Sequence, residues 1–218
     1  MTTPASRLIP SRRQRWSAST KRALVDVAEQ LFTEHGYQAT SLDAIVAGAD
    51  VTKGALYHHF SGKQAIFEAA FERVESRATE GIAEATAGND DPWERAQAGL
   101  RAFLTAVQQP AYRQIVISDG PSVLGHERFR EQEERSTYAI VDQIVRSVLT
   151  SDEWDLDEAM LDTFTRIFFG AMSAAGGSVA VSDDPAAAAA RVEAAIGFIM
   201  TGLRQLLETG AGMPDPGE

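Results

Sequence analysis

The sequence predicts an all-α protein with about nine helices, in which a small N-terminal three-helix unit precedes a larger helical domain. Three observations support this class. Apolar residues recur at three- and four-residue spacing along most of the chain, and no alternating strand pattern of useful length occurs. Capping residues, Gly and Pro stand at the ends of these segments, where helices begin or end. The 218 residues, 44% of them hydrophobic, suffice for one small domain and one larger one.

The chain begins with a Pro-, Ser- and Arg-rich stretch, residues 1–18, which we expect to be a disordered basic arm. Arg12, Arg13 and Arg15 could reach a DNA minor groove, although an arm that stays in solvent is an equal alternative. We expect a helix-turn-helix domain at 19–65, a ligand-binding and dimerisation domain at 66–210, and a disordered tail at 211–218.

The first helix is predicted from Thr20 to His35. Its apolar stripe consists of Ala23, Leu24, Val27, Ala28, Leu31 and Phe32. Gly36 follows directly and is a natural left-handed stop, because glycine has no Cβ to oppose a positive φ.

Residues 40–63 predict two short helices joined by a tight turn. We expect Thr40 to cap the first helix, and Asp43 to suit the dipole of its first turn. The small or turn-tolerant residues 48–50 end that helix. Thr52 is predicted to cap the second helix, Lys53 to about His59.

The second short helix has a chemistry that suits nucleic acid. Leu56 and Phe60 are spaced to point inward, which leaves hydroxyl, ammonium, glycine and imidazole groups outside. Such groups bind phosphates or base edges, so the stretch predicts a DNA-binding helix-turn-helix. The predicted DNA contacts are Thr40, Ser41, Thr52, Lys53, Gly54, Tyr57, His58 and Lys63. The alternative is ordinary half-buried aromatic packing.

The run from Gly36 to Phe67, GYQATSLDAIVAGADVTKGALYHHFSGKQAIF, resembles the N-terminal signature of the tetracycline-repressor (TetR) family of bacterial regulators. The resemblance covers Thr20 to about Phe71, and the chain departs from it at Asp50, where the family commonly has Gly. Asp tolerates left-handed conformations, so we expect the turn to survive. The resemblance implies a homodimer on a palindromic operator, repression as the usual mode, and a small-molecule effector.

Further helices are predicted behind this unit. They run from Ser61 toward Ala87, from Asp91-Pro92 to about Val107, from His126 to Leu149, from a cap at Asp155 to about Val181, and from Asp184-Pro185 to near Glu208. Residues 118–125, SDGPSVLG, are predicted to form a loop.

Two further sites are predicted in this region. Large side chains with few polar tips suit a ligand pocket, and we expect its lining to include Phe103, Tyr112, Tyr138, Phe168 and Met172, each of which could instead be plain core. The last two helices are apolar on more than one stripe and rich in glycine, which predicts a two-fold four-helix dimer interface. Its candidates are Gly170, Gly177, Gly197, Phe198, Gly202 and Leu206, and the alternative is the core of a monomer.

The charge is polarised along the chain. Residues 1–63 carry a net charge of +3, whereas the remainder carries −14. A locally positive unit can hold phosphate, while the acidic body discourages nonspecific adhesion.

Composition and motifs argue against other function classes. The absence of cysteine excludes disulfides and thiolate chemistry. His58 and His59 project about 100° apart on a helix, which does not suit paired metal ligation, and phosphate loops or nucleophile elbows are absent. We therefore expect no catalysis, cofactor or metal.

The predicted function is a ligand-responsive DNA-binding repressor that binds as a homodimer and is released by an unknown, largely apolar effector. A DNA-binding regulator without a ligand is the alternative, with an enzyme on a helical scaffold a remote one. We expect a cytoplasmic protein without membrane contact, because the apolar stretch 167–181 is shorter than the ~20 residues of a membrane span.

Overall fold

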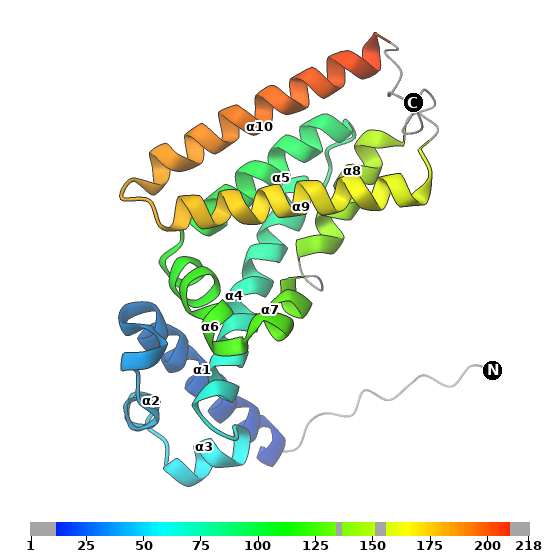
Figure 1. The fold of residues 1–218 in the computed structure, drawn as a ribbon. Helices are drawn as coiled ribbons and strands as arrows, with labels where there is room; N and C mark the ends of the chain where they lie inside the picture. Colours follow the sequence, from blue (N-terminus) through cyan, green and yellow to red (C-terminus); the bar gives the residue numbers. More distant parts are fainter. Residues whose placement is uncertain (1–11, 134–136, 151–155, 210–218) are drawn as a thin grey trace, which may run out of the picture. The chain divides into compact units, whose positions relative to one another are not determined.

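A computed structural model describes residues 12–133, 137–150 and 156–209, and this part of the chain is helical without strands (Figure 1). The all-α prediction is confirmed. The elements are α1 (Arg12–Ala39), α2 (Leu42–Gly48), α3 (Lys53–His59), α4 (Lys63–Thr86), α5 (Pro92–Val107), the π-helical segment η1 (Tyr112–Asp119), α6 (Gly120–Leu124), α7 (His126–Glu133), α8 (Ala139–Leu149), α9 (Glu158–Ala180) and α10 (Pro185–Glu208). They form two compact units, Met1–Phe71 and Glu72–Glu218, and α4 runs from the first into the second.

The N-terminal unit is built on side chains that leave water almost completely. Its buried residues include Leu24, Ala28, Phe32, Ile45, Leu56, Phe60, Ile66, Phe67, Ala70 and Phe71. The Phe32 ring packs edge-on against Phe67 with centroids 5.2 Å apart, and Tyr37 lies at the same distance from Phe67. This aromatic cluster ties α1 to the start of α4, which fixes the frame that carries α2 and α3.

The first helix differs from its prediction at the N-terminal end. It begins at Arg12 rather than Thr20, and the Thr20 hydroxyl donates back to the Trp16 carbonyl over 3.1 Å, one turn earlier. A Thr hydroxyl that donates to the carbonyl four residues earlier is a pattern of helix interiors. The stretch from Arg12 to residue 18 is thus helical and is not part of a disordered arm, whereas residues 1–11 lie outside the described residues. At the other end Gly36, with φ 74°, breaks the helix as predicted.

Caps mark the starts of the later helices. A carboxylate oxygen of Asp91 accepts from the Trp93 N–H over 2.8 Å and begins α5 as predicted, and Asp184 accepts from the Ala187 N–H over 3.0 Å at α10. The cap of α9 is Asp157, whose carboxylate accepts from the Met160 N–H. The predicted cap, Asp155, lies outside the described residues.

One predicted segment is wrong, and a second extends over residues outside the described part of the chain. Residues 118–125 were expected to form a loop, but the end of η1 and all of α6 occupy them. Pro121 stands in the first turn of α6, where a missing N–H costs nothing, and Gly125 ends that helix with φ 79°. The expected single helix from His126 to Leu149 is described as α7 and α8, on either side of residues 134–136.

The Glu72–Glu218 unit is held by apolar contacts between α8 and α9. Val145 and Leu149 of α8 are buried with Leu161 of α9, and Phe164 and Phe168 pack against them. Among the described helices, Pro185–Leu206 within α10 is long and apolar enough to cross a membrane by length and composition alone, a test that core helices of soluble proteins also pass.

Candidate nucleic-acid interface and apolar cavity

The two short helices of the N-terminal unit are capped by side chains. Ser41, not Thr40, caps α2, because its Oγ accepts from the Ala44 N–H over 3.1 Å. Thr40 is 3% exposed and donates its hydroxyl to the carbonyls of Leu31 and Gly36. The predicted cap at Thr40 is therefore wrong, and this hydroxyl joins the end of α1 to the start of α2.

The turn between α2 and α3 depends on Asp50. This residue has φ 51°, the single non-glycine residue with positive φ in the described chain. The N–H of Val51 donates to the Val46 carbonyl over 3.2 Å, which closes the turn behind α2. Asp pays less than most residues for this conformation, so the turn survives without glycine, as predicted.

The α3 helix presents the predicted polar surface. Thr52 caps it by accepting from the Ala55 N–H over 3.2 Å, while Leu56 is fully buried and Phe60 is 6% exposed. Thr52, Lys53, Gly54, Tyr57 and His58 are all exposed, Tyr57 by 59%. At Gly54 an added Cβ would meet only the Thr52 hydroxyl at 3.8 Å, so the backbone there is open to a close approach.

Lys53 is paired across the two helices. Its Nζ lies 2.6 Å from a carboxylate oxygen of Asp43 on α2, and both side chains are exposed. The hydrogen bond to Asp43 and the charge of that carboxylate raise the pKa of Lys53. Asp43 was predicted only to suit the helix dipole. Its contact with Lys53 depends on the angle between α2 and α3, which a sequence pattern does not contain.

Lys63, at the first residue of α4, lies against the end of α1. Its Nζ donates to the Gln38 carbonyl over 3.3 Å and sits 4.2 Å from the centre of the Tyr37 ring. A cation over an aromatic face is attracted by the ring. The ammonium is thus held beside the first turn of α4, the position from which it was predicted to contact a phosphate.

His59 follows the exposed His58 but is partly buried. Burial, followed by the nearby charges of His58 and Lys21, lowers the pKa of His59. Its ring lies 6.5 Å from that of Phe60, and the Lys21 Nζ lies 5.8 Å from the Phe60 ring centre. His59 therefore contributes to packing at the end of α3, whereas His58 faces water.

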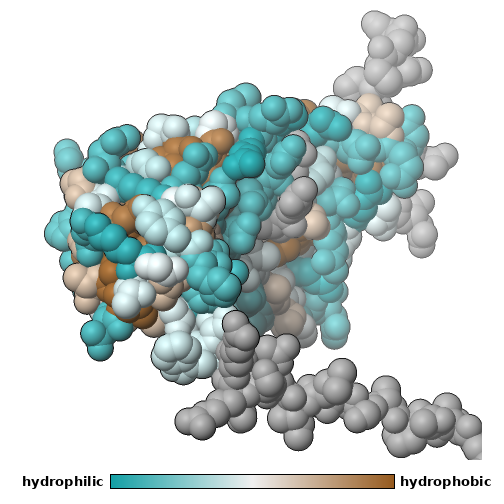
Figure 2. Space-filling view, turned by 90° about the horizontal axis from the view of Figure 1, so that it is seen from below, coloured by the Kyte–Doolittle hydropathy of each residue, from teal (hydrophilic) through white to brown (hydrophobic). Residues whose placement is uncertain are grey.

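The face of the molecule that points downward in Figure 1 is mostly hydrophilic (Figure 2). Brown, apolar areas interrupt it in several places. Such a surface suits water or a polar partner better than an apolar one.

The Glu72–Glu218 unit contains an apolar cavity of about 110 Å³. It lies among side chains of α4, α5, α8, α9 and α10. Three of the predicted pocket residues, Phe103, Phe168 and Met172, line it. Tyr112 is buried elsewhere, and Tyr138 packs edge-on against Phe169 with centroids 5.3 Å apart; neither lines this cavity.

Other residues of the cavity wall were not predicted. They include Trp93, Leu100, Ile144, Val148 and Met200. Their apolar periodicity is the same as that of ordinary core residues, so the sequence alone does not separate the two roles.

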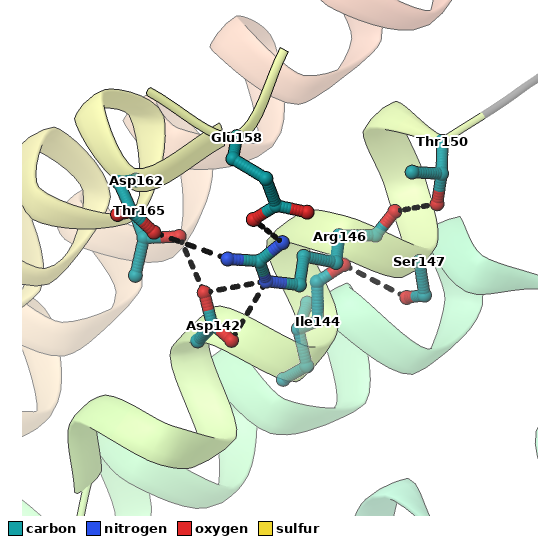
Figure 3. Close-up of polar contacts among 8 residues, drawn as sticks. All are labelled: Asp142, Ile144, Arg146, Ser147, Thr150, Glu158, Asp162 and Thr165. Carbon is teal, nitrogen blue, oxygen red and sulfur yellow. Dashed lines mark hydrogen bonds and ion pairs between the residues drawn. The ribbon is translucent and has the colours of Figure 1, made fainter. Parts of the chain in front are cut away.

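A charged cluster beside the cavity joins α8 to α9 (Figure 3). The Arg146 guanidinium reaches Asp142 at 2.9 Å, Glu158 at 2.8 Å and Asp162 at 3.0 Å, and the Thr165 hydroxyl donates to Asp142 over 3.1 Å. The hydrogen bonds to Glu158 and Asp142 raise the pKa of Arg146. The cluster was not predicted, although the i,i+4 spacing of Asp142 and Arg146 is visible in the sequence.

Helices α9 and α10 also carry large apolar side chains in water. Phe198 is 81% exposed and Ile167 is 61% exposed, and Ile199 and Leu206 are exposed by about half. An added Cβ at Gly170, Gly177, Gly197 or Gly202 would meet nothing within 4 Å. The predicted interface residues thus include open glycines and protruding apolar groups, which is unusual for a surface that stays in water.

Known families match both parts of the chain. Residues 24–70 match the family described as bacterial regulatory proteins, tetR family, and residues 93–203 match the family described as tetracyclin repressor-like, C-terminal domain. The second match covers about half of the chain.

Individual relatives agree with these matches. The chain is 49% identical to the transposon Tn10 TetC protein of Escherichia coli over 55 residues, which are 25% of this chain and 28% of TetC. The matched segments span only 23% to 45% of the length of the first three curated relatives.

Solved structures cover more of the chain. A TetR-family transcriptional regulator from Pectobacterium atrosepticum has a TM-score of 0.70 at 27% identity, covering 89% of this chain and 97% of that one. RolR, solved in complex with its ligand resorcinol, has a TM-score of 0.62 at 19% identity, covering 88% of this chain and 95% of that one.

Proposed function

The chain belongs to the TetR family of bacterial transcriptional regulators, and we propose that it is a ligand-responsive repressor that binds a palindromic operator as a homodimer. That it is a DNA-binding regulator follows from the family. Repression, a palindromic operator, the dimer and the response to a ligand are the proposed part.

The observation that carries the proposal is the exposed face of α3. Its Thr, Lys, Tyr and His side chains and the Gly54 backbone are exposed, outside the core that contains Leu56 and Phe60. A short helix with this chemistry can enter a major groove, where Lys53 donates to guanine edges and hydroxyls bind phosphates. Ser41 and Lys63 would bind the flanking phosphates. The Thr40 hydroxyl is already engaged, so its contribution would be to hold α2 in place.

The open apolar face of α9 and α10 supports a two-fold dimer. Packing Phe198 and Leu206 against the same surface of a second chain would remove them from water, and glycines such as Gly197 and Gly202 would let the helices approach closely. A two-fold dimer places two copies of α3 in successive major grooves, about 34–36 Å apart. A monomer in sedimentation at micromolar concentration would contradict this.

The apolar cavity supports a small-molecule effector. RolR carries resorcinol in its solved structure, and a ligand in the corresponding domain here would act by preferring one conformation of the regulator over another. We place the protein in the cytoplasm, where its DNA is. A regulator that binds DNA without an effector is the second candidate, favoured if no ligand changes operator affinity.

The test begins with selection of bound fragments from genomic DNA, which yields the operator. The Lys53→Ala variant should then lose preference for the operator over random DNA, because it removes a contact with base edges. Arg101→Ala, which changes an exposed cation of the Glu72–Glu218 unit, is the control and should leave the preference unchanged. Equal losses of Lys53→Ala on operator and random DNA would mean that Lys53 contacts only the backbone.

A further inference from the structure

The apolar cavity of the Glu72–Glu218 unit has a wall of uniform chemistry. Eighteen of the described residues line it, none of these is charged, and the polar groups among their side chains are the Thr137 hydroxyl and the Trp93 indole N–H. An ionised group that enters such a site exchanges water for hydrocarbon without gaining a counter-ion. The wall therefore discriminates against carboxylate and ammonium ligands.

The cation of α8, Arg146, does not offset the cost of moving an ionised ligand into this wall. Arg146 follows the lining residue Val145, but its guanidinium points to Asp142, Glu158 and Asp162 (Figure 3). Three carboxylates already surround this one cation. A ligand carboxylate would have to displace them and would meet their negative charge.

The dimensions of the cavity limit the ligand further. Its volume of about 110 Å³ is smaller than the ~150 Å³ of a dry engineered cavity that binds benzene. Phe103, Phe168 and Trp93 are aromatic lining residues, and aromatic side chains pack favourably against an aromatic guest. The Phe103 ring also packs closely on Gly176, where an added Cβ would lie only 2.8 Å from the Phe103 Cζ.

We propose that the effector is an uncharged molecule built on a single six-membered ring, with one or two hydrogen-bonding groups, bound among α5, α8, α9 and α10. This rests on the proposed role of the cavity as the effector site. The ring contacts Phe103 and Phe168, and a hydroxyl on the ring or its first carbon is the kind of group that Thr137 or Trp93 can bind.

The test uses three probes of nearly equal size: benzyl alcohol, benzoate and benzylammonium. Trp93 in the cavity wall reports binding by fluorescence in the full chain once Trp16→Phe and Trp154→Phe remove the other two tryptophans. Benzyl alcohol should bind saturably, and both ions at least tenfold more weakly. Binding of either ion as strong as that of the alcohol would overturn the proposal. A bicyclic probe, 1-naphthalenemethanol, absorbs and emits where Trp93 does, so its binding is measured by calorimetry. It should bind more weakly than benzyl alcohol, and tighter binding would overturn the single-ring limit.

Matched variants locate the bound probe. Ala96 lines the cavity, whereas Ala98 on the same helix points about 200° away and does not. Ala96→Leu should weaken benzyl alcohol binding at least tenfold, and the smaller change Ala96→Val should do so in part. Ala98→Leu should retain binding. Unchanged binding to a folded Ala96→Leu or Ala96→Val variant would overturn the location, and circular dichroism establishes that each variant is folded.

Operator affinity separates this proposal from the function on which it rests. Binding of benzyl alcohol with no change in operator affinity would support the ligand class and contradict the effector role. Release of DNA by benzoate or benzylammonium, with no response to the alcohol, would support the effector role and overturn the ligand class.

Discussion

The Lys53 ammonium on α3 lies 2.6 Å from an Asp43 carboxylate oxygen on α2, so the cation that we place on DNA already has a partner within the protein. To reach a guanine or a phosphate it must leave that carboxylate. Asp43 therefore opposes DNA binding in two ways: it competes for the cation, and it repels the phosphates beside it.

Asp43→Asn should strengthen binding to random DNA by roughly twofold to fivefold, the range expected for one exposed ion pair. The increase should shrink at high salt, because exposed charges are screened. Binding measured by fluorescence anisotropy on random and operator duplexes tests this. The double variant Asp43→Asn/Lys53→Ala should lose most of the increase, and an increase that persists without Lys53 would assign it to repulsion alone.

Lys63→Ala should weaken binding to all sequences alike. Its ammonium is held near the first turn of α4 by the Gln38 carbonyl and the Tyr37 ring, a position suited to a phosphate and not to a base edge. The plot of log affinity against log salt concentration should become less steep, by about one unit of slope for each lost contact and about two for a dimer. An unchanged slope would remove Lys63 from the phosphate contacts. Lys63→Arg, which keeps the charge, serves as the control and should leave the slope near its original value.

Several features of the fold depend only on neighbouring residues in the sequence. Helix periodicity, the Asp91, Asp184 and Thr52 caps and the left-handed Asp50 were all predictable, because each depends on a few neighbouring residues. The α6 helix was missed because its Gly-Pro start reads equally well as a turn.

The candidate sites likewise combine features that neighbouring residues determine with features that the packing of separate helices determines. Exposure of the α3 face follows from the inward positions of Leu56 in the helix and Phe60 at its C-cap, and it was predictable. The Asp43–Lys53 pair and the choice between Tyr112 and Trp93 as cavity wall depend on how separate helices pack, and a single sequence does not carry that information.

Stability should fall in mild acid because of His59. Burial lowers its pKa below the usual 6.5, so the folded state binds fewer protons than the unfolded state at this residue. The full stability is present above about pH 7, declines as pH falls through the unfolded pKa, and levels off below the folded pKa. Urea unfolding at about pH 7.5 and about pH 5.5 measures the difference. His59→Gln should reduce it; a difference as large in the variant as in the original protein would contradict the assignment.

Arg146→Met should destabilise the Glu72–Glu218 unit. Methionine keeps much of the apolar stem but leaves Asp142, Glu158 and Asp162 facing one another without their shared cation. The thermal midpoint should therefore fall further than in Arg101→Met, which breaks one long, exposed contact of 3.9 Å with Glu193. Because Asp142 also accepts from Thr165, the loss should loosen α8 against α9, and α8 forms much of the cavity wall.

Arg146→Met should consequently also weaken benzyl alcohol binding, measured by Trp93 fluorescence at a temperature where the variant is folded. A variant as stable as Arg101→Met would mean that the apolar contacts of Val145, Leu149 and Leu161 hold α8 on α9 without help from the charged cluster.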